Sequence, residues 1–171
     1  MNERRFTTHH LVLMAFLVAA QIVLSRFFSL QLWNLKLGFA FVPIALAGML
    51  LGPVPAALVA VAADLIGATA FPTAAFFPGF TFTACFWGLT YGIFLHKNQS
   101  MKNIIAAVLV YEIIGSLGMN TLWVSILYGA PYLSLVPPRI VQSVGMGILE
   151  IVTLRLIAAY LPSFKKAVLH A

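Results

Sequence analysis

Charged residues are scarce in this sequence of 171 residues, and acidic residues are the scarcest. Charged residues make up 8% of the chain and hydrophobic residues 62%, with a mean hydropathy of +1.01, whereas a soluble domain carries about 25% charged residues. So little charge cannot cover a water-facing surface, and the composition therefore predicts an integral membrane protein. Because a transmembrane helix needs about 20 apolar residues, the length allows six spans and excludes a catalytic or nucleotide-binding domain outside the bilayer.

Several motifs that carry chemistry are also missing. The single cysteine, Cys85, excludes an internal disulfide and a C-x-x-C metal site, and neither G-x-x-x-x-G-K-[ST] nor H-E-x-x-H occurs. We therefore predict no metal site, no cofactor, no ATP site and no enzymatic activity for this chain. Two carboxylates, Asp64 and Glu112, leave an aspartyl-type enzyme acting on lipid as a distant alternative.

Prolines, glycines and polar residues divide the chain into six apolar segments within a single domain, residues 1–171. A proline cannot continue a helix, so Pro53, Pro131 and Pro162 mark boundaries. The expected helices cover residues 8–28, 38–51, 54–70, 79–95, 103–128 and 135–161. The sequence thus predicts an all-α membrane protein, with six transmembrane helices in one bundle.

The ten basic residues lie at helix ends rather than in one cluster, which favours contact with membrane lipid and predicts no nucleic-acid partner. With six spans, both termini and the loop at residues 96–102 share one side. That side carries six of the ten basic residues: Arg4, Arg5, Lys97, Lys102, Lys165 and Lys166. Because Lys and Arg are enriched in cytoplasmic loops, we expect both termini to be cytoplasmic.

Polar residues from four different segments fall in the external half of the expected bundle. A charged group at membrane depth is costly and usually faces a cavity or a partner. Their convergence therefore predicts a ligand pocket that opens to the outside. The candidates are Arg26, Asn34, Lys36, Asp64, Asn120, Trp123, Arg139 and Gln142.

Helical spacing places further polar residues on shared faces. One face of the fifth helix carries Glu112, Ser116, Asn120 and Trp123, and one face of the sixth carries Arg139, Gln142, Ser143, Met146 and Glu150. Two such faces on antiparallel neighbours would line one crevice. For the two serines and two glutamates, hydrogen bonding between helices is the favoured interpretation, and a role in ligand binding stays open.

Aromatic and small residues complete the pattern. The proline-flanked loop after the third helix carries Phe71, Phe76, Phe77 and Phe80, which would close a pocket, stack on a planar ligand, or anchor the chain at the membrane interface. Small residues four positions apart let helices approach closely. They occur at positions 15 and 19, 48 and 52, 63 and 67, and 88 and 92, and most are expected to be internal packing.

A chain of this size with six helices, basic ends and Ala15-x-x-x-Ala19 in its first helix resembles the substrate-binding S components of energy-coupling factor (ECF) vitamin transporters. The similarity covers essentially the whole chain. Three segments look most like the folate-specific members: residues 72–81 (PTAAFFPGFT), 120–123 (NTLW) and 137–142 (PPRIVQ). The resemblance implies capture of extracellular folate at the bacterial cell membrane. It also implies that Ala15 and Ala19 meet a transmembrane coupling subunit, which two separate ATPase subunits power.

The same resemblance suggests how the pocket would hold folate, which joins a planar pterin, an aminobenzoyl ring and an anionic glutamate. The pterin edge would bond to Asp64 or Asn120, and the rings would stack on Trp123, Phe76 or Phe77. The glutamate carboxylates would pair with Arg26, Lys36 or Arg139, and Gln142 would complete the site.

Two other functions stay open at this point. One is an S component for another vitamin, such as riboflavin or pantothenate, although a neutral ligand would leave Arg26 and Arg139 without an anionic partner. The other is a scaffold membrane protein of cell-wall assembly that binds no small ligand. In a scaffold, substitutions at Arg26, Asp64 or Asn120 would alter only stability or partner binding.

Overall fold

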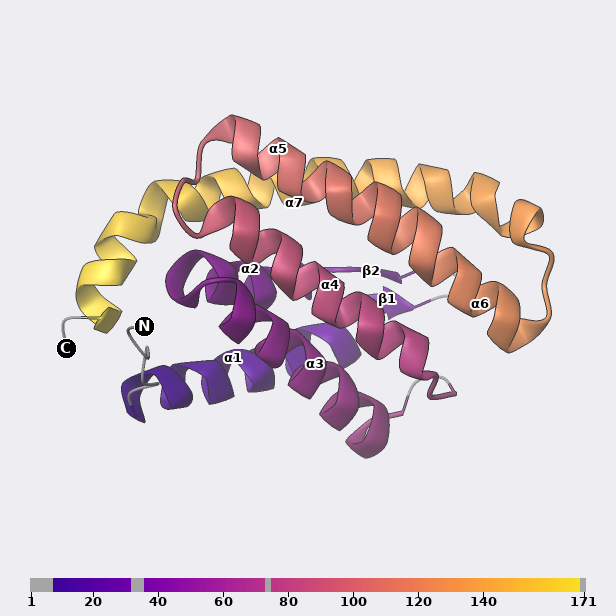
Figure 1. Cartoon of the computed structure of the whole chain (residues 1–171), viewed down its shortest axis with the longest axis horizontal. Coiled ribbons are helices and arrows are strands. Elements are labelled where there is room, and N and C mark those ends of the chain that lie inside the picture. The colour runs from indigo at the N-terminus through magenta and orange to yellow at the C-terminus, as the bar shows by residue number, and fades with distance from the viewer. Residues whose placement is uncertain (1–7, 32–35, 73–74, 170–171) are drawn as a thin grey trace, which may run out of the picture.

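The structure, a computed structural model, is built almost entirely of helices (Figure 1). It describes residues 8–31, 36–72 and 75–169, with the backbone alone at residues 31, 36 and 162–169. The helices are α1 (Thr8–Arg26), α2 (Phe41–Leu51), α3 (Pro53–Ala70), α4 (Pro78–Leu95), α5 (Met101–Val110), η1 (Tyr111–Asn120), α6 (Thr121–Tyr128) and α7 (Tyr132–Leu169). Since α5, η1 and α6 follow one another without a break, the described part contains six helical rods, as predicted.

Glycine, proline and serine set several of the helix ends. Gly52 joins α2 to α3 with φ 98°, a conformation that favours glycine, and Pro53 then begins α3. Gly129, with φ 64°, ends α6. Ser100 caps α5 because its side chain accepts a hydrogen bond from the backbone N–H of Asn103 at 3.4 Å.

The last helix differs from the prediction. It begins at Tyr132 and continues to Leu169, through Pro137, Pro138 and Pro162. A proline removes one backbone hydrogen bond and often kinks a helix without ending it. Figure 1 shows the C-terminal part of α7 turning back toward the N-terminal end of the molecule.

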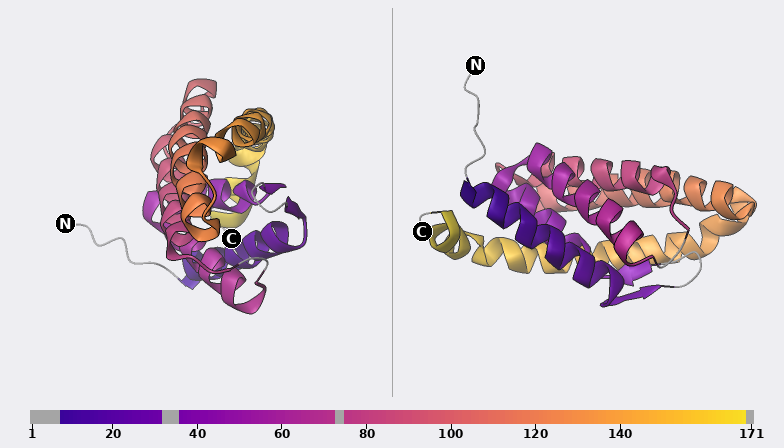
Figure 2. Two further views of the ribbon diagram at one scale, coloured as in Figure 1. Left: turned by 90° about the vertical axis from the view of Figure 1, so that its right-hand side faces the viewer. Right: turned by 90° about the horizontal axis from the view of Figure 1, so that it is seen from below.

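The segment after α1 is also more regular than predicted, so the chain is not purely α-helical. Residues Ser29–Gln31 (β1) and Lys36–Gly38 (β2) pair antiparallel, with Leu30 opposite Leu37. This small hairpin follows α1 and contacts α7 (Figure 2). Leucines alternate with other residues at positions 30–32 and again at 35–37, on either side of Trp33 and Asn34. This is a strand signal that the sequence reading missed.

The middle of the fifth rod, η1, is a π-helix rather than the predicted α-helix. A π-helix is rare and is frequently found at functional sites. The Thr121 hydroxyl donates to the carbonyl of Ser116, five residues earlier, at 3.3 Å. The wider helical turn changes which residues of this rod share a face, and η1 borders the cavity described below.

Four helical stretches among the described residues are long and apolar enough to cross a membrane: residues 8–26, 53–70, 101–128 and 132–161. The α2 helix is apolar but has only 11 residues, and α4 is not among the four. The structure therefore supports a multi-pass membrane protein, with four of the six predicted spans meeting both requirements. The exposed surface is apolar, as at Phe16 and Val141, which are 67% and 74% exposed.

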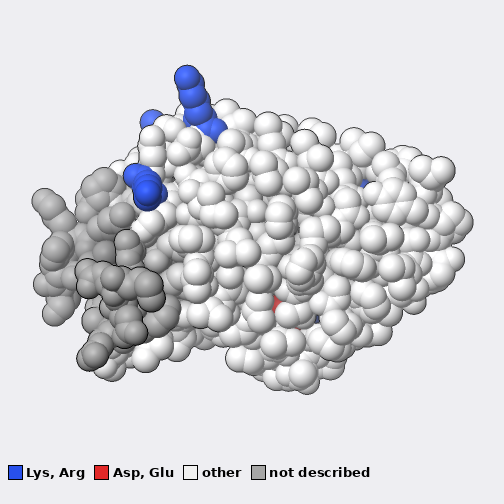
Figure 3. Space-filling view, in the orientation of Figure 1, with Lys and Arg blue, Asp and Glu red and all other residues white. Residues whose placement is uncertain are grey.

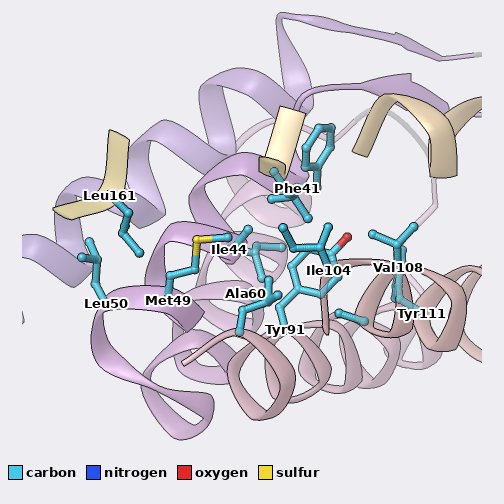
Figure 4. Close-up of a cluster of buried hydrophobic side chains, with 14 of the residues drawn as sticks. Phe41, Ile44, Met49, Leu50, Ala60, Tyr91, Ile104, Val108, Tyr111 and Leu161 are labelled. Atoms are coloured by element: carbon cyan, nitrogen blue, oxygen red, sulfur yellow. The ribbon is translucent and has the colours of Figure 1, made fainter. Parts of the chain in front are cut away.

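The core is formed by buried side chains of α2, α3, α4, α5, η1 and α7 (Figure 4). Phe41, Ile44, Tyr91 and Ile104 are fully buried there. The helices approach closely because the contact residues are small: a Cβ atom at Gly92 would lie 2.1 Å from Cα of Pro53. The glycine pair at 88 and 92 is therefore internal packing, as expected.

On the face shown in Figure 3, the exposed charge lies mostly near one end of the molecule. The start of α1 and the end of α7 lie at the same end in Figure 1, and most of the Lys and Arg atoms visible in Figure 3 project near that end. The rest of that face is almost free of visible charge. A basic end and an uncharged flank suit a bundle that crosses a lipid bilayer.

Candidate ligand-binding site

A cavity of about 300 Å³ lies between α1, α3, α4, η1 and α7. This volume is at the lower end of the range for small-molecule sites, about 300–1,000 Å³. Seven of the nine predicted binding residues line the cavity: Arg26, Asp64, Phe76, Phe77, Asn120, Arg139 and Gln142. The fold thus brings together residues that lie more than 100 positions apart in the sequence.

Arg26 and Asp64 lie at one end of this cavity. We call it the outer end, because the orientation predicted from the sequence places it toward the outside. Arg26 is the last residue of α1, and its guanidinium packs over Gly67 of α3. The Asp64 carboxylate is near enough to interact electrostatically with Arg26, and its Oδ2 accepts a hydrogen bond from the Thr81 hydroxyl at 2.7 Å. This end therefore offers a cation whose position depends on α3 and α4.

Aromatic rings form one wall beside this outer end. Phe76 is 51% exposed, and Phe77 packs against Phe80 and Trp123 with ring centroids 6.1 Å and 5.7 Å apart. Trp123 is not among the cavity-lining residues. Its indole N–H donates to the Thr83 hydroxyl at 3.0 Å, so Trp123 supports Phe77 from behind instead of facing the cavity as predicted.

The inner end of the cavity is polar and buried. A bond between the Ser116 and Ser143 hydroxyls, 3.1 Å apart, joins η1 to α7, and the Tyr91 hydroxyl donates to Oε2 of Glu150 at 2.5 Å, joining α4 to α7. These contacts are the helix-to-helix bonds that the sequence favoured. Yet Glu112, Ser116 and Glu150 also line the cavity. A role in ligand binding therefore stays open for these residues beside their hydrogen bonding between helices.

The lining residues that sequence reasoning missed include Gln21, Thr83, Trp87 and Tyr111. The rings of Trp87 and Tyr111 stack with centroids 4.5 Å apart and planes 7° apart, giving the cavity a flat wall. Gln21 carried a usable signal, because it is a polar residue inside the first apolar run. The aromatic residues carried none, since aromatic residues occur throughout the chain.

Four predicted residues lie away from the cavity or outside the described residues. Lys36 lies in β2, but its side chain is outside the described residues, and so is the whole of Asn34. Ala15 and Ala19 are both exposed on α1, so the pair is accessible to a partner.

The family of this chain is decided by sequence. The profile described as "ECF transporter, substrate-specific component" matches residues 9–158. The chain belongs to this family. The membership confirms the predicted S component, and the family is one of transporter components rather than of enzymes.

Relatives of this S component are described as folate transporters. "Folate transporter FolT" of Clostridium novyi (strain NT) is 37% identical over 137 residues, which is 80% of each chain. The protein of the same name from Leuconostoc mesenteroides is 34% identical over 149 residues, covering 83% of this chain and 80% of the relative. A solved structure, "Crystal structure of FolT bound with folic acid", matches with a TM-score of 0.82 and 33% identity, over 86% of this chain and 92% of that one.

Proposed function

We propose that this S component captures folate from outside the cell and delivers it into the cytoplasm as part of an ECF transporter. The observation that carries the proposal is the cavity, which combines a flat aromatic wall with Arg26 and Arg139. That combination suits a planar, anionic vitamin. The likeness to a FolT structure holding folic acid supports the same ligand.

The outer end of the cavity suits the charged tail of folate. Arg26 would pair with the glutamate carboxylates by charge-assisted hydrogen bonds, with Lys36 as a second cation. Phe76 and Phe77 would pack on the aminobenzoyl ring. Asp64, Asn120 and Gln142 would supply polar contacts along the cavity, and Trp123 would hold Phe77 in place.

The rest of the assembly follows from the family and the charge distribution. We place residues 1–171 in one domain of six spans in the bacterial cell membrane, with both termini cytoplasmic. Energy would come from two separate ATPase subunits, joined through a transmembrane coupling subunit that meets α1 at Ala15 and Ala19. The chain itself would need no cofactor and would catalyse no reaction.

Calorimetric titration of the detergent-purified chain tests the ligand. We expect folic acid to bind tightly and near one to one, whereas riboflavin and pantothenate give no heat. Heat with another vitamin instead would replace folate by that vitamin. No heat with any of the three, from a sample with a cooperative thermal unfolding transition, would favour a scaffold that binds no small ligand.

A further inference from the structure

Two charged side chains at the inner end of the cavity keep an unused hydrogen-bonding atom. Within the described residues, Oε2 of Glu112 and Nε of Arg139 have no hydrogen-bond partner, although the side chains are only 6% and 7% exposed. An unpaired buried polar group is costly, and more so when it is charged. Because both residues line the cavity, a bound molecule can supply the missing partners.

The packing of η1 against α7 places both groups on the wall of the same cavity. Nη1 of Arg139 donates to the carbonyl of Ser116 at 3.4 Å, and Ser116 lies one turn beyond Glu112 on η1. Gly147 of α7 lies beside Glu112: a Cβ atom there would lie 3.9 Å from Cγ of Glu112, an ordinary van der Waals distance. The serine pair Ser116–Ser143 fixes the same two helices. An acceptor and a donor therefore face the cavity from adjacent helices.

The other two acidic residues that line the cavity each accept a hydrogen bond from another helix. Asp64 accepts a hydrogen bond from Thr81, and Glu150 accepts one from Tyr91 and is 1% exposed. Glu3, the fourth acidic residue, lies outside the described residues. Among the described acidic residues, Glu112 is the one with a buried carboxylate oxygen that has no hydrogen-bond partner.

We propose that Glu112 determines specificity for the heterocycle of the ligand. Its carboxylate accepts the parallel N–H donors of a 2-amino-4-oxo-pteridine edge, from the 2-amino group and N3, while Arg139 donates to the neighbouring carbonyl oxygen. This inference rests on the proposed function and deepens it. It assigns the pterin edge to Glu112 rather than to Asp64 or Asn120, and it moves Arg139 from the glutamate tail to the heterocycle.

Charge and shape at the inner end both favour this orientation of the ligand. Glu112 and Glu150 lie there together, so they would repel the carboxylates of a glutamate tail. The stacked rings of Trp87 and Tyr111 line the same cavity and offer a flat surface to a planar heterocycle. In the bound ligand the pterin therefore lies at the inner end of the cavity, and the glutamate tail lies at the outer end beside Arg26.

A binding cycle with two proteins and two ligands tests the contact. The proteins are the wild type and Glu112→Gln, and the ligands are folic acid and its 2-desamino-2-methyl analogue, in which a methyl group replaces the exocyclic amine. The wild type is expected to bind the analogue more weakly than folic acid, on the order of 100-fold. Glu112→Gln is expected to weaken folic acid binding by a similar factor and to discriminate between the two ligands less than about 5-fold.

The matched control is Glu150→Gln, the same substitution at a buried glutamate whose oxygen already has a partner. Whatever its overall affinity, this variant should keep the wild-type ratio between the two ligands. A purely structural role for Glu112 predicts that Glu112→Gln keeps that ratio too, which would overturn the inference.

If Glu112→Gln does not fold, the affinities of the wild type for the two ligands still test the inference. Equal affinity of the wild type for the two ligands would overturn the inference and leave folate capture standing. A folded wild type that binds no folic acid would overturn both the inference and the proposed function.

Discussion

The guanidinium of Arg26 packs directly over Gly67: a Cβ atom at position 67 would lie 2.8 Å from Nε of Arg26. Arg26 ends α1 and Gly67 lies near the end of α3, so a glycine in one helix makes room for the cation of another. The position of the cation at the outer end of the cavity therefore depends on a residue that carries no side chain of its own.

The first prediction concerns this pair. Arg26→Ala should weaken folate binding roughly 10- to 100-fold, since hydrogen bonds to a charged group contribute about 1.5–3 kcal/mol. Gly67→Ala should weaken it several-fold with little loss of stability, because the added methyl group displaces the flexible end of Arg26 rather than backbone. Calorimetric titration gives both affinities. Unchanged affinity in Gly67→Ala would show that Arg26 is not held in place by this contact.

The second prediction concerns the contact between α3 and α4. In Gly92→Ala the new Cβ would meet the backbone of Pro53 at 2.1 Å, so the helices must separate. Overpacking of this kind typically costs 1–3 kcal/mol, and the thermal unfolding temperature should fall by several degrees. Gly145→Ala is the control, since nothing lies within 4 Å of its Cβ and alanine favours a helix. Equal unfolding temperatures for the two variants would contradict the packing described here.

The third prediction separates ligand capture from assembly. Ala15→Trp places a large side chain on the exposed face of α1, where close approach of a partner helix requires a small residue. Folate affinity should stay within about 3-fold of the wild type, while co-purification of the coupling subunit is lost. Ala159→Trp, at an exposed alanine of α7, should retain the subunit. If Ala15→Trp co-purifies as well as the control, α1 does not dock through this residue.

The fourth prediction concerns orientation in the membrane. In a Cys85→Ser background, a cysteine at exposed Asn98, between α4 and α5, should react with an impermeant maleimide only after the cells are permeabilised. A cysteine at Leu133, which is 81% exposed at the start of α7, should react in intact cells. The background protein without cysteine controls for non-specific labelling. The reverse pattern would place both termini outside.

Much of the fold could be predicted because helix boundaries are local. Pro53, Gly129 and Ser100 act through their own backbone geometry or side chain, so the sequence alone indicates where those helices begin or end. The exceptions depend on tertiary context. The α7 helix continues past Pro162, and the π-helical turns of η1 lie against other helices of the bundle, which spacing along one segment does not reveal.

The sequence by itself determined that this chain belongs in a membrane, that it forms six helical rods, and that polar residues gather toward one end. Composition and local breaks suffice for those conclusions. Only the tertiary structure decided which polar atoms remain unpaired, because the partners of Asp64 and Glu150 lie 17 and 59 positions away in the chain. Hydrogen bonds between distant residues engage one oxygen of each of those two carboxylates and hold the Trp123 indole against Thr83. Oε2 of Glu112 has no such partner among the described residues.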